Sequence, residues 1–236
     1  MSKNHCVSEE EPPGSTKRRK RIVVVDDHPL VLEGLVSLIR ATPDLTVTGQ
    51  AGCADEVWQL LETETPDLLL LDLSLPGING IELIKDVNAR YPRLRILVLS
   101  MHEESVYTER VLRAGACGYI MKHEPGSRIV EAARCVLRGE LYVSPAVAAL
   151  LVKKHVDGKP SEGCDDIGQL SDRELQVFTC LGDGLSSQEI AAQFGLSIKT
   201  VHTHREHIKR KLGIRNASNL VHYATQWSQA QRRQGA

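Results

Sequence analysis

The feature that most constrains the fold is an alternation of short apolar runs with amphipathic, helix-period segments through the first two thirds of the chain. Each run is mostly aliphatic and is followed by a stretch with apolar residues every three or four positions. Runs that are apolar throughout indicate strands buried on both faces, as in a parallel sheet with helices on each side. We therefore predict an α/β domain with a five-stranded, doubly wound parallel sheet, whose strands span 21–26, 45–51, 67–72, 95–100 and 118–122.

The third run, DLLLLD, ends on a carboxylate, and polar residues end or follow three other runs as well. The carboxyl ends of parallel strands meet at one edge of a sheet, so these side chains should converge. Three carboxylates in one place repel one another and require a cation, and oxygen ligands of this kind suit Mg²⁺. The converging residues are Asp26, Asp27, Asp72, Ser100 and Lys122.

The sequence has no glycine-rich phosphate loop, and no His or Cys is paired as a nucleophile. The candidate nucleophile is therefore an aspartate of the cluster, which suggests phosphoryl chemistry. An aspartate beside Mg²⁺ and a lysine can attack phosphorus and form an acyl phosphate, while the two cations neutralise the phosphoryl oxygens. A single aspartate at a strand end is more often a helix cap or turn residue. The conjunction of polar residues on four strands favours a site.

The pattern changes after Ser144. Residues 144–156 fit one helix, and the Gly-, Pro- and Asp-rich stretch that follows fits a linker. Beyond Leu170 the apolar runs are replaced by four short helical segments, two of which begin with Ser-x-x-Glu capping boxes. These segments predict a small all-α domain, with helices over 171–184, 186–195, 197–213 and 216–227.

The second and third of these segments predict a helix-turn-helix, because two capped helices are joined by a short turn beginning at Gly195. Residues 197–215 hold six Lys or Arg and one acid, Glu206. Local basicity beside hydrogen-bonding side chains is typical of a helix that reads DNA, although a solvated basic face is common. The candidate DNA contacts are Lys199, Thr200, His202, Thr203, His204, Arg205, Glu206, Lys209 and Lys211.

The segments VVVDDHPL, LLLLDLSLPGING, LVLSMHE and GACGYIMK, in this order, resemble two-component receiver domains with a flavodoxin-like fold. This resemblance implies that Asp72 accepts a phosphoryl group from a sensor histidine kinase. It also implies an Mg²⁺ site formed by Asp26, Asp27, Asp72 and the backbone carbonyl of Ser74. The same resemblance implies a phosphoryl contact at Lys122, a switch hydroxyl at Ser100 and a switch aromatic at Tyr119.

Residues 170–224 resemble LuxR-type DNA-binding domains, which together with the receiver places the chain among the NarL/FixJ response regulators. The resemblance implies binding to double-stranded DNA and a homodimer upon phosphorylation. Two positions depart from the usual pattern: His202 stands where lysine is common, and Glu206 where a basic or neutral residue is common. Glu206 either accepts a hydrogen bond from a cytosine amino group or only tunes repulsion from phosphates.

These features divide the chain into a disordered tail (1–20), a receiver (21–140), a linker with a helix (141–168) and a helix-turn-helix domain (169–232). The six scattered cysteines form no CxxC pair and predict reduced thiols. No apolar run reaches the roughly 18 residues that span a bilayer, so no membrane association is expected. We expect a cytoplasmic protein.

The sequence thus predicts a phosphorylation-activated DNA-binding regulator and not an enzyme. A phosphoaspartyl hydrolase would need a carboxylate at position 74, where serine stands, and a protein-binding module would not need a basic recognition helix. We further hypothesise that the unphosphorylated receiver packs against the helix-turn-helix and hides the recognition helix. The sequence names no stimulus, cognate kinase or operator, and it leaves open activation or repression, the resting oligomeric state and the phosphoryl lifetime.

Overall fold

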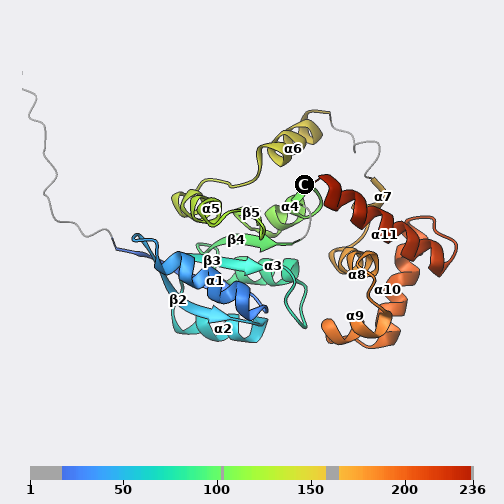
Figure 1. Ribbon diagram of the computed structural model, residues 1–236, viewed down its shortest axis with the longest axis horizontal. Coiled ribbons are helices and arrows are strands. Elements are labelled where there is room, and N and C mark those ends of the chain that lie inside the picture. The colour runs from blue at the N-terminus through green and yellow to red at the C-terminus, as the bar shows by residue number, and fades with distance from the viewer. Residues whose placement is uncertain (1–17, 102–103, 158–164, 235–236) are drawn as a thin grey trace, which may run out of the picture.

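The computed structural model describes residues 18–101, 104–157 and 165–234. Its N-terminal unit is built on a parallel sheet in the order β2-β1-β3-β4-β5 (Figure 1). This arrangement confirms the predicted five-stranded parallel sheet. The strands are β1 (Lys20–Val25), β2 (Leu45–Ala51), β3 (Leu68–Asp72), β4 (Arg95–Ser100) and β5 (Gly118–Met121).

The run of leucines in β3 forms a fully buried strand because helices cover both faces of the sheet. Leu68 and Leu70 pack with α1 (Pro29–Arg40) and α5 (Gly126–Arg138). The alternate residues, Leu69 and Leu71, belong to the core on the other face, with α2, α3 and α4. The doubly wound prediction is therefore confirmed, with α2 at Ala54–Thr63, α3 at Gly80–Arg90 and α4 at Glu104–Ala114.

The strand order places a topological switch point between β1 and β3. From β1 the chain turns outward to β2 on one side and then returns to β3 on the other. In parallel sheets the connections leave a crevice at such a point, beyond the carboxyl ends of the strands. Asp26 follows β1 and Asp72 ends β3, so both lie at this crevice.

The segment after α5 is attached to the sheet rather than free of it. Tyr142 forms an isolated parallel bridge with Gly118, and its carbonyl accepts from the backbone N–H of Tyr119 at 2.9 Å. The Ser144 N–H then donates to Glu104 Oε1 at 2.8 Å, just before α6 (Pro145–Asp157), which fulfils the predicted helix. This attachment covers the edge of β5 and sets α6 against α4.

One predicted segment, the tail, falls largely outside the described residues, and the predicted linker does so in part. Residues 1–17 of the predicted tail are not described. The rest of the predicted tail includes Lys20, which begins β1 and whose N–H donates to the Asp44 carbonyl at 2.9 Å. In the predicted linker, residues 158–164 are not described, and the short helix α7 (Asp165–Gly168) follows them. The sheet and the second unit thus each extend slightly into segments predicted to be irregular.

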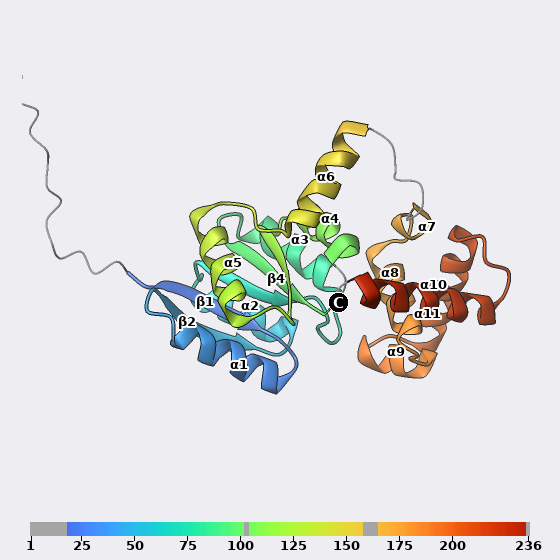
Figure 2. The ribbon, with the colours of Figure 1, turned by 45° about the horizontal axis from the view of Figure 1, so that its top comes forward.

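The C-terminal unit is the predicted bundle of short helices, seen beside the N-terminal unit in both ribbon views (Figures 1 and 2). Both capping boxes are present: Ser171 and Glu174 exchange backbone-to-side-chain bonds before the first long helix, and Ser186 and Glu189 do so before the second. Gly195 has a φ of +62° in the turn of the helix-turn-helix. The helices are α8 (Asp172–Gly182), α9 (Ser187–Gln193), α10 (Ile198–Lys211) and α11 (Ala217–Gln234).

The last helix continues past the predicted end at residue 227 and packs on α8. The Phe178 ring lies 5.5 Å from that of Trp227 and 5.9 Å from that of Tyr223, measured between centroids. Within the part of the chain that the structure describes, none of the helices is both long and apolar enough to cross a membrane.

Candidate functional site

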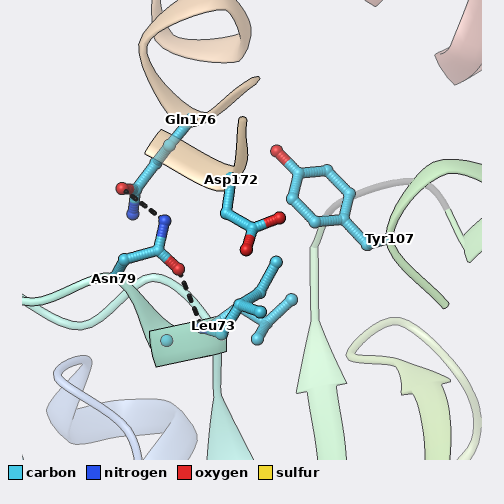
Figure 3. Close-up of a pocket in the computed structure, with 7 residues that line it drawn as sticks. Leu73, Asn79, Tyr107, Asp172 and Gln176 are labelled. Atoms are coloured by element: carbon cyan, nitrogen blue, oxygen red, sulfur yellow. Dashed lines mark hydrogen bonds between the residues drawn. The ribbon is translucent and has the colours of Figure 1, made fainter. Parts of the chain in front are cut away.

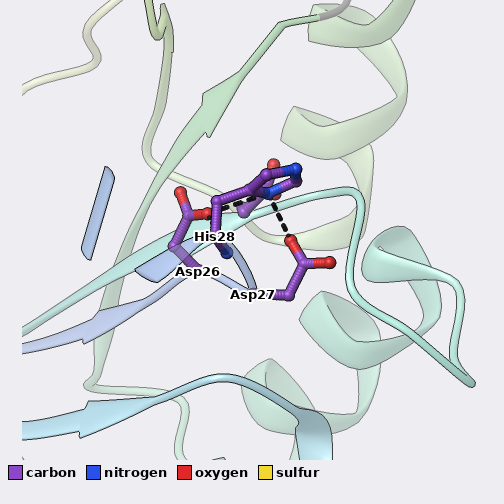
Figure 4. Close-up of side chains that lie close together, drawn as sticks. Asp26, Asp27 and His28 are labelled. Atoms are coloured by element: carbon purple, nitrogen blue, oxygen red, sulfur yellow. Dashed lines mark hydrogen bonds and ion pairs between the residues drawn. The ribbon is translucent and has the colours of Figure 1, made fainter. Parts of the chain in front are cut away.

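The strand ends bring an acidic cluster together at the switch point. One ligand atom each from Asp26, Asp27, His28 and Asp72 lies within 4.8 Å of the others (Figure 4). Asp26 and Asp72 are each 1% exposed, whereas Asp27 is partly open to solvent. The three predicted carboxylates therefore share one site, and two of them are buried charges that need compensation.

Lys122 supplies part of this compensation. Its ammonium nitrogen lies 2.6 Å from Asp26 Oδ2 and 2.8 Å from Asp72 Oδ2, and its side chain is only 6% exposed. Burial raises the pKa of Asp72 above its usual value, and the Lys122 ammonium opposes this rise. One buried ammonium thus bridges two buried carboxylates, which explains how the apolar strand β3 can end on a charge.

The donor set of the cluster fits a hard divalent cation. Oδ2 of Asp26 and both carboxylate oxygens of Asp72 are buried, and the polar groups that approach Asp72 are the Lys122 ammonium and the Ser74 backbone. Three carboxylates face one ammonium, so negative charge remains in excess, and carboxylate oxygens are the ligands that Mg²⁺ prefers. Ser74 lies two residues beyond Asp72, and its carbonyl remains a predicted ligand.

His28 is a member of the cluster that the sequence analysis missed. Its Nδ1 lies 2.7 Å from Asp27 Oδ1 and 3.4 Å from Asp26 Oδ1, and its backbone N–H donates to Asp26 Oδ1 at 3.0 Å. The available signal was the proline that follows, since Pro29 starts α1 and leaves His28 as the preceding cap position. That position directs His28 back toward both aspartates.

Ser100 and Tyr119 lie together beside the cluster, and each is fully buried. Ser100 ends β4, and a side-chain hydrogen bond joins it to Tyr119 on β5. Burial raises the pKa of Tyr119 well above its usual value, and the bond to Ser100 works in the opposite direction. In this arrangement the Tyr119 ring is buried, and its hydroxyl group is hydrogen-bonded to Ser100.

A second polar cluster lies between the receiver and the helical domain. Asp172, the first residue of α8, accepts from Lys85 on α3 and from Arg110 on α4, each at 2.9 Å. Arg110 also donates to the carbonyls of Ile167 and Gly168 at 3.3 and 3.2 Å. Asp172 is therefore clamped by two cations of the receiver.

Neutral hydrogen bonds extend this contact, and Figure 3 shows the one between Asn79 and Gln176. The Tyr107 hydroxyl on α4 lies 3.0 Å from Thr179 Oγ1 on α8, and the Asn79 amide donates to Gln176 Oε1 at 3.3 Å. Both bonds are buried and join residues 72 and 97 positions apart, so no local pattern could have predicted them. Asn79 lies at the end of the loop that follows Asp72, and Tyr107 lies on α4, which follows Ser100. Both segments that lead away from the acidic cluster therefore contact α8.

The structure corrects the hypothesis that the receiver covers the recognition helix. The receiver contacts α8 and the end of α9, where the Gly77 N–H approaches the Gln193 carbonyl at 3.4 Å. The buried side of α10 holds Val201 and Ile208 and faces its own domain. On the opposite side, five residues are exposed: Lys199, His202, Thr203, Glu206 and Arg210.

Several predicted DNA contacts have partners within the helical domain. Lys211 Nζ lies 2.6 Å from Oε2 of the buried Glu174, and His204 is half-buried, with its pKa lowered by burial and then by Arg173. These two residues lie toward α8 and not on the exposed face. The other pairs are Arg205 with Ser187 at 2.6 Å, Lys209 with Glu206 at 2.9 Å, and Thr200 with Ser197 at 2.7 Å.

Comparison with known families agrees with this division into two units. Residues 22–134 match the model of the response regulator receiver domain. Residues 168–224 match the model of bacterial regulatory proteins of the luxR family. The first match contains the acidic cluster and Lys122, and the second contains the helix-turn-helix.

Similar proteins extend over nearly the whole chain. The oxygen regulatory protein NreC of Staphylococcus carnosus is 34% identical over 203 residues, which cover 84% of this chain and 94% of that protein. NreC of Staphylococcus aureus strain JH9 is 35% identical, with the same coverage. The fold, the acidic site and these relatives define a two-component response regulator.

Solved structures agree with this class. A LuxR-family response regulator from Aurantimonas is 36% identical, with a TM-score of 0.55 over 58% of this chain and 99% of that one. RcsB from Salmonella enterica serovar Typhimurium, bound to promoter P1flhDC with phosphomimetic BeF3-, is 27% identical, with a TM-score of 0.64 over 89% of this chain and all of that one. The chain belongs to the NarL/FixJ response regulators, as a transcription regulator and not an enzyme.

Proposed function

We propose that a sensor histidine kinase transfers a phosphoryl group to Asp72, and that this transfer controls DNA binding through the contact between the receiver and α8. The observation that carries the proposal is the Lys122 ammonium, which bridges Asp72 and Asp26 at the switch point of the sheet. A buried carboxylate beside a fixed ammonium is prepared to accept a negatively charged group. We place this reaction in the cytoplasm, where kinase domain and DNA are both accessible.

In the proposed reaction, a carboxylate oxygen of Asp72 attacks phosphorus as the bond from phosphorus to the kinase histidine nitrogen breaks. The product is an acyl phosphate, and the Lys122 ammonium neutralises charge on its oxygens. The ligands for Mg²⁺ would be Asp26, Asp27, Asp72 and the Ser74 carbonyl, and the bound ion would supply further positive charge beside the phosphoryl oxygens.

The route from Asp72 to the DNA-binding domain passes through buried hydroxyl groups. Ser100 is held by Tyr119, Tyr119 lies near Tyr107, and Tyr107 bonds Thr179 of α8. We infer that the phosphoryl group draws the Ser100 hydroxyl toward its oxygens. Tyr119 then loses its partner and α4 shifts, which weakens the Tyr107–Thr179 bond and the clamp on Asp172.

Release of α8 would let two DNA-binding domains take up the spacing of a DNA site. The exposed side of α10 is open to solvent in the present arrangement, so release acts on the position of the domain and not on access to that face. A phosphorylated homodimer would read two half-sites about one helical turn apart. The similar RcsB was solved on promoter DNA in the presence of a phosphomimetic, which agrees with DNA binding by the phosphorylated form.

The test is phosphorylation in vitro. The full chain is incubated with Mg²⁺ and a small acyl-phosphate donor, and intact mass is followed for the wild type, Asp72→Asn and Asp55→Asn, an exposed carboxylate on α2. We expect one phosphoryl adduct in the wild type and in Asp55→Asn, none in Asp72→Asn, and none when EDTA is added before the donor. An adduct that persists in Asp72→Asn would refute the assignment of the acceptor.

A second measurement separates phosphorylation from its readout. Ser100→Ala should still accept the phosphoryl group but should not gain DNA affinity from it, because the hydroxyl that Tyr119 holds is missing. DNA binding is measured by gel shift with and without the donor, at several salt concentrations. Equal gains in affinity for the wild type and Ser100→Ala would exclude the proposed route through Ser100.

A further inference from the structure

The geometry points to Glu206 and Lys209 as a pair that reads a C·G base pair in the major groove. The inference rests on the proposed DNA binding by α10 and names the base-pair chemistry that this helix would recognise. It starts from an unexpected feature, namely a single carboxylate at the centre of a basic, solvent-facing helix side.

Glu206 occupies the side of α10 that would point into a groove. Lys199, Thr203, Glu206 and Arg210 recur at intervals of four, three and four residues, which places them on one line along a helix of 3.6 residues per turn. Ile208 and Val201 are fully buried on the opposite side. When a recognition helix enters the major groove, the line opposite its core faces the base edges. The Glu206 side chain is 69% exposed on that line.

The charge of Glu206 restricts what it can contact. Phosphate oxygens repel a carboxylate, so contact with the DNA backbone is unfavourable, whereas base edges in the major groove offer hydrogen-bond donors. Only the N4 amino group of cytosine and the N6 amino group of adenine donate there. Adenine places its N7 acceptor on one side of that donor, which repels a carboxylate, whereas cytosine carries a C5–H group on the corresponding side. Glu206 is therefore matched to cytosine.

Lys209 completes the match to a base pair. Its ammonium lies 2.9 Å from Glu206 Oε1, and its side chain is 16% exposed. The pair thus presents an acceptor and a donor side by side. A C·G pair presents the reverse pattern, the cytosine N4 donor beside the guanine O6 acceptor. The same ammonium also reduces the repulsion between Glu206 and the phosphates.

The experiment is selection of binding sites from a pool of random duplex DNA, with the full chain before and after treatment with the acyl-phosphate donor. The proteins are the wild type, Glu206→Gln, Glu206→Ala and Glu131→Gln, which removes one exposed carboxylate from the receiver as a charge control. We expect the wild type and Glu131→Gln to select C·G at one position of each half-site. Glu206→Gln should select A·T there, because glutamine pairs with adenine N6 and N7. Glu206→Ala should lose selection at that position alone.

Direct titration of selected duplexes gives the magnitude. Replacing the C·G pair by T·A should weaken wild-type binding about 10-fold or more and leave Glu206→Ala nearly unchanged. Identical selected sites for the wild type and Glu206→Gln would overturn this inference while leaving DNA binding intact. If the wild type enriched no sequence and showed no salt-dependent binding, the proposed DNA-binding function itself would fall.

Discussion

The Tyr107 hydroxyl of the receiver donates a buried hydrogen bond to Thr179 of the DNA-binding domain, with 3.0 Å between the two oxygens. Thr179 Oγ1 also donates to the Leu175 carbonyl at 3.0 Å, so its own proton is used and Tyr107 must be the donor. Because α4 follows the strand that ends at Ser100, this bond joins the element next to Ser100 to the first long helix of the DNA-binding domain.

We predict that Tyr107→Phe loosens the contact between the two domains without disturbing their cores. The ring remains, and the loss of one neutral hydrogen bond costs about 0.5–1.5 kcal/mol. Because the contact between the two domains is proposed to restrain DNA binding, the unphosphorylated variant should bind DNA roughly 2- to 10-fold more tightly than the wild type. Gel-shift titration without a phosphoryl donor measures this, and Tyr142→Phe, in the segment that covers β5, is the control. Unchanged affinity in Tyr107→Phe would show that this bond does not restrain the DNA-binding domain.

The clamp on Asp172 predicts a pH dependence of domain contact. Burial raises the pKa of Asp172, but the bonds from Lys85 and Arg110 outweigh it, so the pKa lies below its usual value. The ionised Asp172 carboxylate stabilises the contact between the two domains at pH values above its ordinary pKa of about 4. This stabilisation is lost as the pH falls through the lowered pKa.

Asp172→Asn should therefore be more open than the wild type at pH 6, and it should lack the part of the acid-induced opening that Asp172 causes. The radius of gyration from small-angle scattering, measured from pH 6 to about pH 2, tests this because the scan then passes through the lowered pKa of Asp172. Asp86→Asn on α3 removes an exposed carboxylate beside Lys85 and should behave like the wild type. Identical pH profiles for Asp172→Asn and the wild type would contradict the clamp.

Asp72→Asn should stabilise the metal-free protein. Burial raises the pKa of Asp72, so its ionised form opposes folding, and stability falls as the pH rises from the unfolded pKa to the folded one. A neutral side chain of the same shape removes this cost, and the melting temperature in EDTA should rise by roughly 2–4 °C per kcal/mol gained. A lower melting temperature than the wild type in EDTA would contradict this prediction.

Lys122→Met should have the opposite effect. Without the ammonium, the buried carboxylates of Asp26 and Asp72 would face each other uncompensated, which costs about 3–5 kcal/mol. The melting temperature in EDTA should fall by roughly 6–20 °C. Added Mg²⁺ should recover part of this loss if the cluster binds the ion, and calorimetric scans with and without Mg²⁺ measure both effects.

Substitutions of two lysines of α10 should distinguish a lysine that stabilises the fold from one that contacts DNA. Lys211 compensates Glu174, whose side chain is 6% exposed, and despite burial this ammonium lowers the Glu174 pKa. Lys211→Met should therefore lower the melting temperature of the DNA-binding domain. Lys199→Met should leave it unchanged but reduce the salt slope of DNA binding by about one. Normal melting of Lys211→Met together with a reduced slope would identify Lys211 as a phosphate contact instead.

Much of the fold followed from local patterns. Four consecutive leucines predicted β3, because a strand that is buried on both faces is apolar throughout. The Ser-x-x-Glu capping boxes predicted the starts of α8 and α9. The meeting of Asp26, Asp72 and Lys122 also followed from sequence, because all parallel strands place their carboxyl ends at one edge. Periodicity likewise predicted the exposed position of Glu206 on α10.

The tertiary structure decided which partners these residues meet. The sequence left Lys199 and Lys211 equally suited to phosphate, but only Lys211 lies beside the buried Glu174, 37 positions away. Tyr107 and Thr179 are 72 positions apart, and their bond depends on how the two units dock. Periodicity, caps and strand ends act over one or two turns, so they reveal which side of an element is buried. They do not reveal what that side is buried against, because that depends on packing between distant elements.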